Sequence, residues 1–194
     1  MKKYIKAGYV ITCVGDKGDF SFLESRHSGT LSDRVAIHTL DKMHIPYKQY
    51  SYLARGSDER QYNSPGVDLP IASITRSKYH EYPEYHTSAD DFNFIKAEYM
   101  EESINVYKRC VDVLEGNYIY KNRMLCEPQL GKRDLYPSIS IKSNGRHPAQ
   151  TRTDILAYCN GKNSIFDVAN IIGIELKTVI REISLLKRNN IIRG

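Results

Sequence analysis

Residues 5–14 read Ile-Lys-Ala-Gly-Tyr-Val-Ile-Thr-Cys-Val, a mostly apolar run that ends in the turn sequence Gly15-Asp16-Lys17-Gly18-Asp19. A short apolar run bounded by turn residues is typical of a buried strand in an α/β sheet. Further strands are predicted at residues 20–23, 47–54 and 69–75. Ser32 and Asp33 are predicted to cap a helix over residues 34–43.

The hydrophobic period changes after Asp90. Apolar residues now recur three, four and seven positions apart, namely Phe92, Ile95, Tyr99, Val106, Cys110 and Val113. This pattern predicts an amphipathic helix of about six turns. Ser88, Asp90 and Asp91 are candidate caps at its start, and Gly116-Asn117 ends it. The apolar stripe is interpreted as core packing rather than as a ligand groove.

Composition and cysteine placement exclude several classes of protein. The 194 residues are 41% hydrophobic and 26% charged, which indicates a globular chain and excludes a disordered tail or a fibre. No apolar run approaches the roughly 18 residues of a transmembrane helix. Residues 1–6 show no export signal, so a cytoplasmic location is expected. The cysteines stand far apart, at positions 13, 110, 126 and 159, which argues against a zinc finger and predicts reduced thiols.

The charge is unevenly distributed along the chain. Residues 1–128 hold 17 Lys and Arg against 18 Asp and Glu, whereas residues 129–194 hold 11 against 5. This asymmetry predicts two modules, with residues 129–148 as a linker that contains prolines and glycines. Helices are predicted at 152–159, at 165–172 after a capping sequence at Ser164, and from Glu175 to Lys187. With a terminal strand, they predict a winged helix-turn-helix over residues 149–194.

The third of these helices would enter the major groove if the module bound DNA. It would present basic and polar residues to bases and phosphates, namely Lys177, Thr178, Arg181, Lys187 and Arg188. The helix offers no Gln or Asn for adenine before Asn189, and little chain remains for a wing. A packing role within or between molecules is therefore favoured over nucleic-acid binding.

Ionisable and aromatic residues are densest between Gly56 and Asp91. His86 is flanked by aromatic residues at the expected start of a helix, and Asp90 follows it four residues later. Neutral imidazole is a good zinc ligand when its other nitrogen finds an acceptor, and Asp58 or Asp90 could serve. Spacing alone favours the alternative that His86 only makes hydrogen bonds at a corner, because one histidine does not make a metal site.

Four motifs, taken together and in this order, resemble a bacterial aminopeptidase-like family that is often associated with polysaccharide biosynthesis. They are Ser57-Asp58-Glu59-Arg60-Gln61-Tyr62, Pro65-Gly66-Val67-Asp68-Leu69-Pro70, Tyr82-Pro83-Glu84-Tyr85-His86-Thr87-Ser88-Ala89-Asp90 and Glu127-Pro128-Gln129-Leu130-Gly131-Lys132-Arg133. This family is a branch of the zinc aminopeptidase superfamily. The resemblance covers residues 5–136 and implies the C-terminal half of such a domain, with part of a mixed sheet and flanking helices. It also implies a winged helix after the fourth motif.

The resemblance assigns roles to six residues. His86 would be a ligand of a zinc ion, one ion in the intact family, and Asp58 and Asp90 would be catalytic carboxylates that support it. Three further residues would contact substrate: Arg60, Tyr62 and Tyr85. Glu59 stands where the superfamily has a histidine, so its role is left open.

The other ligands and the general-base glutamate of the family have no counterpart here. Zinc hydrolysis needs about three protein ligands, a water molecule and a base. The chain is therefore expected to be the C-terminal portion of a zinc-dependent hydrolase of peptide or amide bonds, inactive alone. An N-terminal half or a homo-oligomer would be its partner, and no membrane contact is expected. The alternative is a binding or regulatory module, with the winged helix contacting DNA or protein beside a catalytically dead scaffold.

Overall fold

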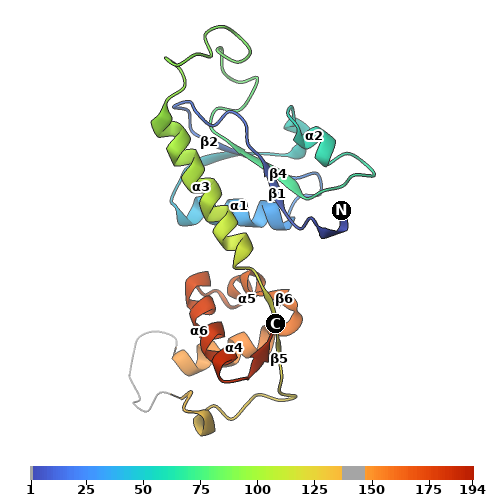
Figure 1. Ribbon diagram of the computed structural model, residues 1–194, viewed down its shortest axis with the longest axis vertical. Coiled ribbons are helices and arrows are strands. Elements are labelled where there is room, and N and C mark those ends of the chain that lie inside the picture. The colour runs from blue at the N-terminus through green and yellow to red at the C-terminus, as the bar shows by residue number, and fades with distance from the viewer. Residues whose placement is uncertain (1, 137–146) are drawn as a thin grey trace. The chain divides into compact units, whose positions relative to one another are not determined.

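The computed structural model describes residues 2–136 and 147–194. They form two compact units, Met1–Leu114 and Glu115–Gly194 (Figure 1). Of the linker predicted at 129–148, residues 137–146 lie outside the described residues.

The first unit is built on a four-stranded mixed sheet with the order β1-β4-β2-β3. Its strands are β1 (Gly8–Val10), β2 (Phe20–Leu23), β3 (Tyr47–Tyr50) and β4 (Ile71–Thr75). Strand β1 runs parallel to β4, β2 runs parallel to β3, and β2 is antiparallel to β4. Every residue of β2 and β4 is buried, as expected for central strands covered on both faces. The predicted α/β fold with a mixed sheet is confirmed.

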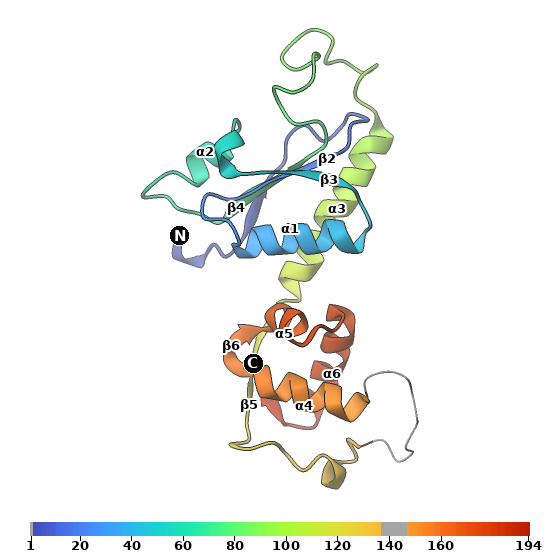
Figure 2. The same cartoon turned by 180° about the vertical axis from the view of Figure 1, so that it is seen from behind.

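Two longer helices accompany this sheet, α1 (Leu31–Lys42) and α3 (Ala97–Glu115) (Figure 2). The Tyr107 hydroxyl of α3 lies 3.1 Å from the Val10 carbonyl and 2.5 Å from the Ile74 carbonyl, which fixes α3 to β1 and β4. Shorter helical turns complete the unit: η1 (Lys2–Tyr4), η2 (Tyr52–Ala54) and α2 (Glu59–Tyr62).

Helix α1 begins one turn earlier than predicted. Its N-cap is Thr30, and the Asp33 carboxylate accepts hydrogen bonds from the Thr30 amide at 2.9 Å and hydroxyl at 2.8 Å. Ser32, a predicted cap, instead accepts a hydrogen bond from the Gly8 amide at 2.9 Å and donates to the Pro70 carbonyl. Ser32 does not cap the helix, because its buried hydroxyl ties α1 to the sheet. Asp33 takes part in the capping box with Thr30.

Helix α3 begins at Ala97 and has 19 residues, so the predicted start near Asp90 was wrong. The Asp91 carboxylate accepts a hydrogen bond from the Asn93 amide at 2.7 Å. This local bond stabilises a turn that competes with helix formation. Phe92, predicted to face the core, is exposed in that turn.

In residues 115–136 and 147–194, the second unit combines three α-helices and one helical turn with a three-stranded antiparallel sheet of order β6-β5-β7. The elements are β5 (Ile119–Asn122), η3 (Gly131–Arg133), α4 (Pro148–Tyr158), β6 (Asn160–Ser164), α5 (Ile165–Ile172), α6 (Leu176–Arg188) and β7 (Ile192–Arg193). Helix α5 begins at the predicted capping box of Ser164 and Asp167 and ends at Gly173, whose φ is 66°. Glycine adopts this left-handed conformation without strain, which explains the abrupt end of the helix.

The division between the units differs from the predicted boundary at residue 128. Strand β5, which had not been predicted, pairs with both β6 and β7. Residues 117–123 therefore share hydrogen bonds with the basic C-terminal segment. Over the part of the chain that the structure describes, no helix is long and apolar enough to cross a bilayer.

Candidate functional site

The segment between β4 and α3 carries an aromatic cluster of six rings: Tyr79, His80, Tyr82, Tyr85, His86 and Phe94. Tyr85 lies at its centre. The Tyr85 ring stacks on the His86 ring with 4.0 Å between centroids, and it meets His80 edge-on at 4.8 Å. In both cartoon views the segment, coloured green, projects beyond the N-terminal end of α3. The stacking holds the His86 ring although the residue itself is exposed.

His86 does not start a helix, contrary to the sequence prediction. Its φ is 57°, a left-handed conformation that is uncommon outside glycine. The Thr87 amide donates to the Glu84 carbonyl at 3.0 Å, so His86 sits inside a turn. The first residue of α3 follows only at Ala97.

Glu59 anchors the aromatic cluster to helix α2. The residue is 0% exposed, and its Oε1 accepts hydrogen bonds from the Gly56 amide at 2.7 Å, the Ser57 amide at 2.9 Å and the Tyr79 hydroxyl at 2.8 Å. Burial by itself raises the pKa of Glu59, but these hydrogen bonds outweigh it and hold the pKa below its ordinary value. Burial and the bond to Glu59 raise the pKa of Tyr79. Oε2 has no hydrogen-bond partner within the described ranges.

Gly56 makes this contact possible. A Cβ atom at position 56 would lie 2.5 Å from the Tyr79 ring. A side chain there would push Tyr79 away from Glu59, so glycine is required by the close approach.

The turn after β1 is tied to the same segment. The Tyr82 hydroxyl donates to Cys13 Sγ at 3.4 Å, and the Arg76 amide donates to the Cys13 carbonyl at 2.8 Å. The buried Asp16 carboxylate accepts a 2.6 Å hydrogen bond from the Ser77 hydroxyl. Because β1 and β4 are parallel, their carboxyl ends meet at one edge of the sheet, which is where α/β proteins commonly bind ligands.

Lys78 is a buried cation beside the cluster. Its ammonium lies 4.0 Å from the centre of the Tyr79 ring and 5.3 Å from that of Tyr50. Burial lowers the pKa of Lys78, and the carboxylates of Glu81 and Glu59 oppose that shift. The rings and carboxylates compensate a charge that would otherwise be costly to bury.

The six residues assigned from the resemblance are only partly brought together. The Tyr85 ring stacks on the ring of His86. Burial raises the pKa of Tyr85, and the positive charge of nearby Arg60 partly opposes that rise. Burial and the hydrogen bond to Cys13 raise the pKa of Tyr82, and the negative charge of Asp90 raises it further. Asp58, which precedes α2, and Tyr62, its last residue, are exposed, and no side-chain hydrogen bond of theirs is found in the described residues.

The residues present do not fit a complete zinc site. Within residues 2–136 and 147–194, no group of three or more His, Cys, Asp or Glu side chains could hold a metal ion. Structural and catalytic zinc sites take three or four protein ligands. His86 could contribute one ligand, and further ligands would have to come from another polypeptide segment.

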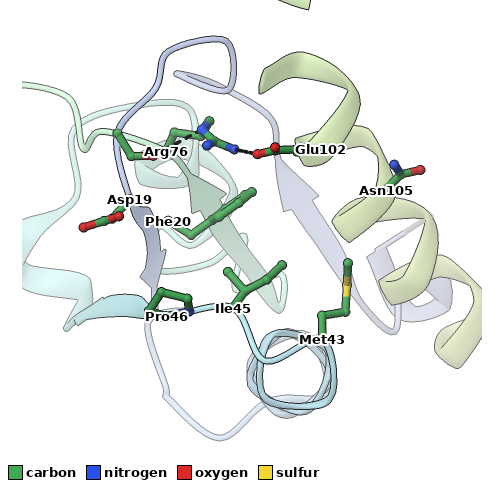
Figure 3. Close-up of a pocket in the computed structure, with 9 residues that line it drawn as sticks. Asp19, Phe20, Met43, Ile45, Pro46, Arg76, Glu102 and Asn105 are labelled. Atoms are coloured by element: carbon green, nitrogen blue, oxygen red, sulfur yellow. Dashed lines mark hydrogen bonds and ion pairs between the residues drawn. The ribbon is translucent and has the colours of Figure 1, made fainter. Parts of the chain in front are cut away.

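A pocket of about 430 Å³ lies beside Arg76 (Figure 3). The Arg76 guanidinium donates to Glu102 at 2.8 Å and to the Gly18 carbonyl at 3.2 Å, and it lies 4.6 Å from the centre of the Phe20 ring. Its charge is therefore already compensated within the fold. This arrangement packs α3 against β2.

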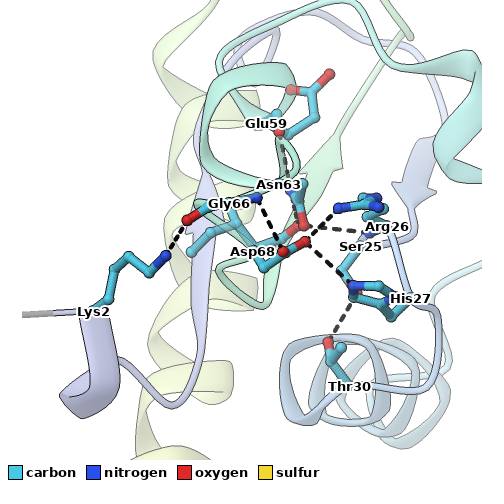
Figure 4. Close-up of polar contacts among 10 residues, drawn as sticks. Lys2, Ser25, Arg26, His27, Thr30, Glu59, Asn63, Gly66 and Asp68 are labelled. Atoms are coloured by element: carbon cyan, nitrogen blue, oxygen red, sulfur yellow. Dashed lines mark hydrogen bonds and ion pairs between the residues drawn. The ribbon is translucent and has the colours of Figure 1, made fainter.

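A polar network beneath α2 holds the second motif in place (Figure 4). The Asn63 amide group donates to the carbonyls of Glu59 at 3.0 Å and Ile71 at 2.9 Å. Asp68 accepts from Arg26 and lies 3.3 Å from His27 Nε2. His27 is thus an exposed partner of Asp68.

Sequence reasoning missed Glu59, Tyr79 and Lys78 as organisers of the site. The one available signal was Glu59, an acidic residue where the superfamily motif has histidine. Its contact with Tyr79 spans 20 positions of sequence, so no local pattern predicts it.

Comparisons with known proteins follow the division into two units. A model of a domain of unknown function, DUF4910, matches residues 1–117, and a winged helix-turn-helix model matches residues 118–194. A protein of Clostridium acetobutylicum, named as a polysaccharide biosynthesis protein with an aminopeptidase-like domain, is 34% identical over 178 residues. These are 91% of this chain and 41% of that protein.

A solved structure extends the similarity to the fold. The crystal structure of a protein assigned as a peptidase, also from Clostridium acetobutylicum, matches with a TM-score of 0.79 and 30% identity. The match covers 99% of this chain and 42% of that one, so the chain spans less than half the length of either relative. The expected similarity to aminopeptidase-like proteins of polysaccharide biosynthesis is confirmed, with this chain corresponding to their C-terminal part. The chain belongs to the DUF4910 family and carries a C-terminal winged helix-turn-helix.

Proposed function

We propose that this chain is the C-terminal portion of a zinc-dependent aminopeptidase-like hydrolase that cleaves a peptide or amide bond in a small substrate. The observation that carries the proposal is the placement of His86. Contacts through Tyr85, Tyr79 and Glu59 hold its loop at the carboxyl ends of the parallel strands β1 and β4. Similarity to a protein assigned as a peptidase supports the same function.

His86 would be a zinc ligand in this proposal, and Asp58 and Asp90 would be the carboxylates that support it. Arg60 would bind a negatively charged group of the substrate, since a guanidinium pairs well with a carboxylate. Tyr62 and Tyr85 would supply aromatic surface. The chain alone would be inactive, because its described residues do not assemble three metal ligands.

Zinc binding tests this assignment. We expect the purified chain to bind zinc weakly and His86→Ala to lower the affinity by about 10-fold or more, because a ligand is lost. Competition with a chromogenic chelator would measure both affinities. His27→Ala is the matched control, since His27 is exposed and pairs only with Asp68 among the contacts found. Equal affinities of the wild type and His86→Ala would overturn the role of His86, and amide hydrolysis by the chain alone would overturn its inactivity.

A second candidate function is a binding module in the basic second unit. Lys177, Arg181, Lys187 and Arg188 are exposed on α6. A cleft of about 500 Å³ is also lined by Lys121, Arg123 and Arg193. Such cations favour a polyanion or an acidic protein face.

Fluorescence anisotropy with a random DNA duplex separates the two kinds of partner. Binding to DNA would weaken steeply between about 50 and 200 mM salt, because counterions are released on binding. Unchanged anisotropy at low salt would exclude DNA and leave a protein partner for the module.

A further inference from the structure

One face of the sheet in the second unit carries exposed cations at directly opposed positions. Lys121 of β5 pairs in register with Arg193 of β7, so the two side chains stand next to each other on that face. Arg123 follows Lys121 by two residues and projects to the same side, and its amide continues the ladder by donating to the Ile191 carbonyl at 2.9 Å. Like charges at directly opposed positions destabilise an antiparallel sheet, so a bound anion would stabilise this one.

The protein supplies no counter-charge to these cations. Lys121, Arg123 and Arg193 make no ion pair and no side-chain hydrogen bond within the described residues. Two acidic residues of the unit are engaged elsewhere, since Glu182 pairs with an arginine of α4 and Asp167 closes the capping box of α5. The sequence of residues 137–146 contains no Asp or Glu.

The three cations line a single cleft of about 500 Å³. Its volume falls within the range of roughly 300–1,000 Å³ that is usual for small-molecule sites. A Cβ atom at Gly161, whose φ is 80°, would lie 3.3 Å from Lys121 Cδ, so the lysine stem runs directly across this glycine. The Asn122 side-chain oxygen accepts a hydrogen bond from the Met124 amide at 2.9 Å, which turns the chain immediately after β5. Backbone contacts therefore fix the chain on both sides of Arg123.

This cleft is distinct from the exposed face of α6. Tyr120 alternates with Lys121 along β5 and therefore points to the opposite side of the sheet. The ammonium of Lys187, on α6, lies 5.8 Å from the centre of the Tyr120 ring. Helix α6 thus lies on the Tyr120 side, and its Lys177 and Arg181 do not line the cleft.

We propose that this cleft binds two neighbouring phosphate groups through Lys121, Arg123 and Arg193. A guanidinium forms paired hydrogen bonds with phosphate oxygens, and an ammonium adds a point charge. A phosphate monoester carries about 1.5 to 2 negative charges near pH 7, whereas a carboxylate carries one, so phosphates suit three closely spaced cations better than an acidic side chain does.

Two neighbouring phosphates occur both in a free diphosphate compound and in a nucleic-acid backbone. The inference rests on the second candidate function, the binding module, and is independent of the proposed hydrolase. Isothermal titration calorimetry of the full chain with inorganic pyrophosphate and with a short random DNA duplex distinguishes the two sources. Pyrophosphate binding would identify a free diphosphate compound, and binding of the duplex alone would identify a nucleic-acid backbone.

Substitutions in the cleft test the site itself. We expect Arg123→Gln and Arg193→Gln each to weaken binding of the active probe by about 10-fold or more, because each removes a charged hydrogen-bond donor. Arg193→Gln should nevertheless be no less stable than the wild type, because it relieves the repulsion from Lys121. Hydrogen exchange at the amides of β5 in the full chain, without ligand, would measure that stability.

Arg181→Gln is the matched control, because it makes the same change of charge on an exposed side chain of α6 outside the cleft. It should leave unchanged the affinity that the cleft substitutions weaken. Absence of binding to both probes, or equal affinities of wild type, Arg123→Gln and Arg193→Gln, would overturn the proposal. Faster exchange of β5 in Arg193→Gln would also overturn it, by showing that this arginine stabilises the sheet. Duplex binding that only Arg181→Gln weakens would overturn the cleft and leave a binding module that acts through α6.

Discussion

Glu59→Ala is expected to destabilise the first unit by about 3 kcal/mol or more, because it leaves three buried or half-buried donors without their acceptor. These donors are the amides of Gly56 and Ser57 and the hydroxyl of Tyr79, all on Glu59 Oε1. Hydrogen exchange of the full chain would measure the loss at the amides of β4, which α2 contacts. The amides of α5 and α6 in the second unit serve as the internal reference.

Tyr79→Phe is the graded control for this prediction. It removes one of the three hydrogen bonds and leaves the Glu59 carboxylate in place, so we expect a smaller loss of about 1 kcal/mol. The double variant Glu59→Ala/Tyr79→Phe should lose less than the sum of the single variants, because both remove the same bond. Strict additivity would show that the Glu59–Tyr79 bond does not stabilise the unit.

The same carboxylate gives the first unit a pH dependence. The pKa of Glu59 in the folded state is lower than in the unfolded chain, where it is about 4.3. Its contribution to stability is therefore fully present above about pH 4.3 and is lost as pH falls through the folded-state pKa. In Glu59→Gln this part of the acid dependence should disappear, which a comparison of unfolding free energies from pH 3 to pH 7 would reveal.

The sequence predicted the ends of an element correctly where residues close by in the chain determine them. Helix α5 has the predicted bounds, because a capping box and a left-handed glycine fix its two ends. The start of α3 was wrong because two local patterns compete there, and the Asp91 turn prevailed over the amphipathic period. Strand β5 was missed because its partners, β6 and β7, lie about 40 and 70 residues away along the chain.

The candidate site shows the same limit. His86 stands out in the sequence by its motif, and the structure adds that Tyr85 stacks on its ring. The buried partners that fix this loop, Glu59 and Lys78, carry charges and resemble surface residues in a sequence. Only the fold shows that rings and backbone amides surround them.

Arg152→Ala is expected to destabilise the second unit by about 3 kcal/mol, because it leaves the carboxylate of a buried ion pair poorly compensated. Arg152 Nε lies 2.8 Å from Glu182 Oε2, and the two side chains are only 14% and 7% exposed. Arg152 also donates to the Leu135 carbonyl at 2.5 Å, so its loss frees a second acceptor. Hydrogen exchange at the amides of α4 and α6 in the full chain would report the change.

Arg181→Ala is the control that distinguishes the effect of a buried ion pair on stability from the effect of removing one positive charge. Arg181 contacts the other oxygen of the same carboxylate at 3.4 Å, but its side chain is 75% exposed. Exposed ion pairs contribute little because solvent screens them, so we expect a loss below about 0.5 kcal/mol. Similar losses in Arg152→Ala and Arg181→Ala would mean that total charge, and not the buried pair, stabilises the packing of α4 on α6.

The two arginine substitutions also test the function of the module. A partner that binds the exposed face of α6 should lose affinity for Arg181→Ala, whose stability is unchanged. Arg152→Ala should weaken binding only as far as the unit unfolds.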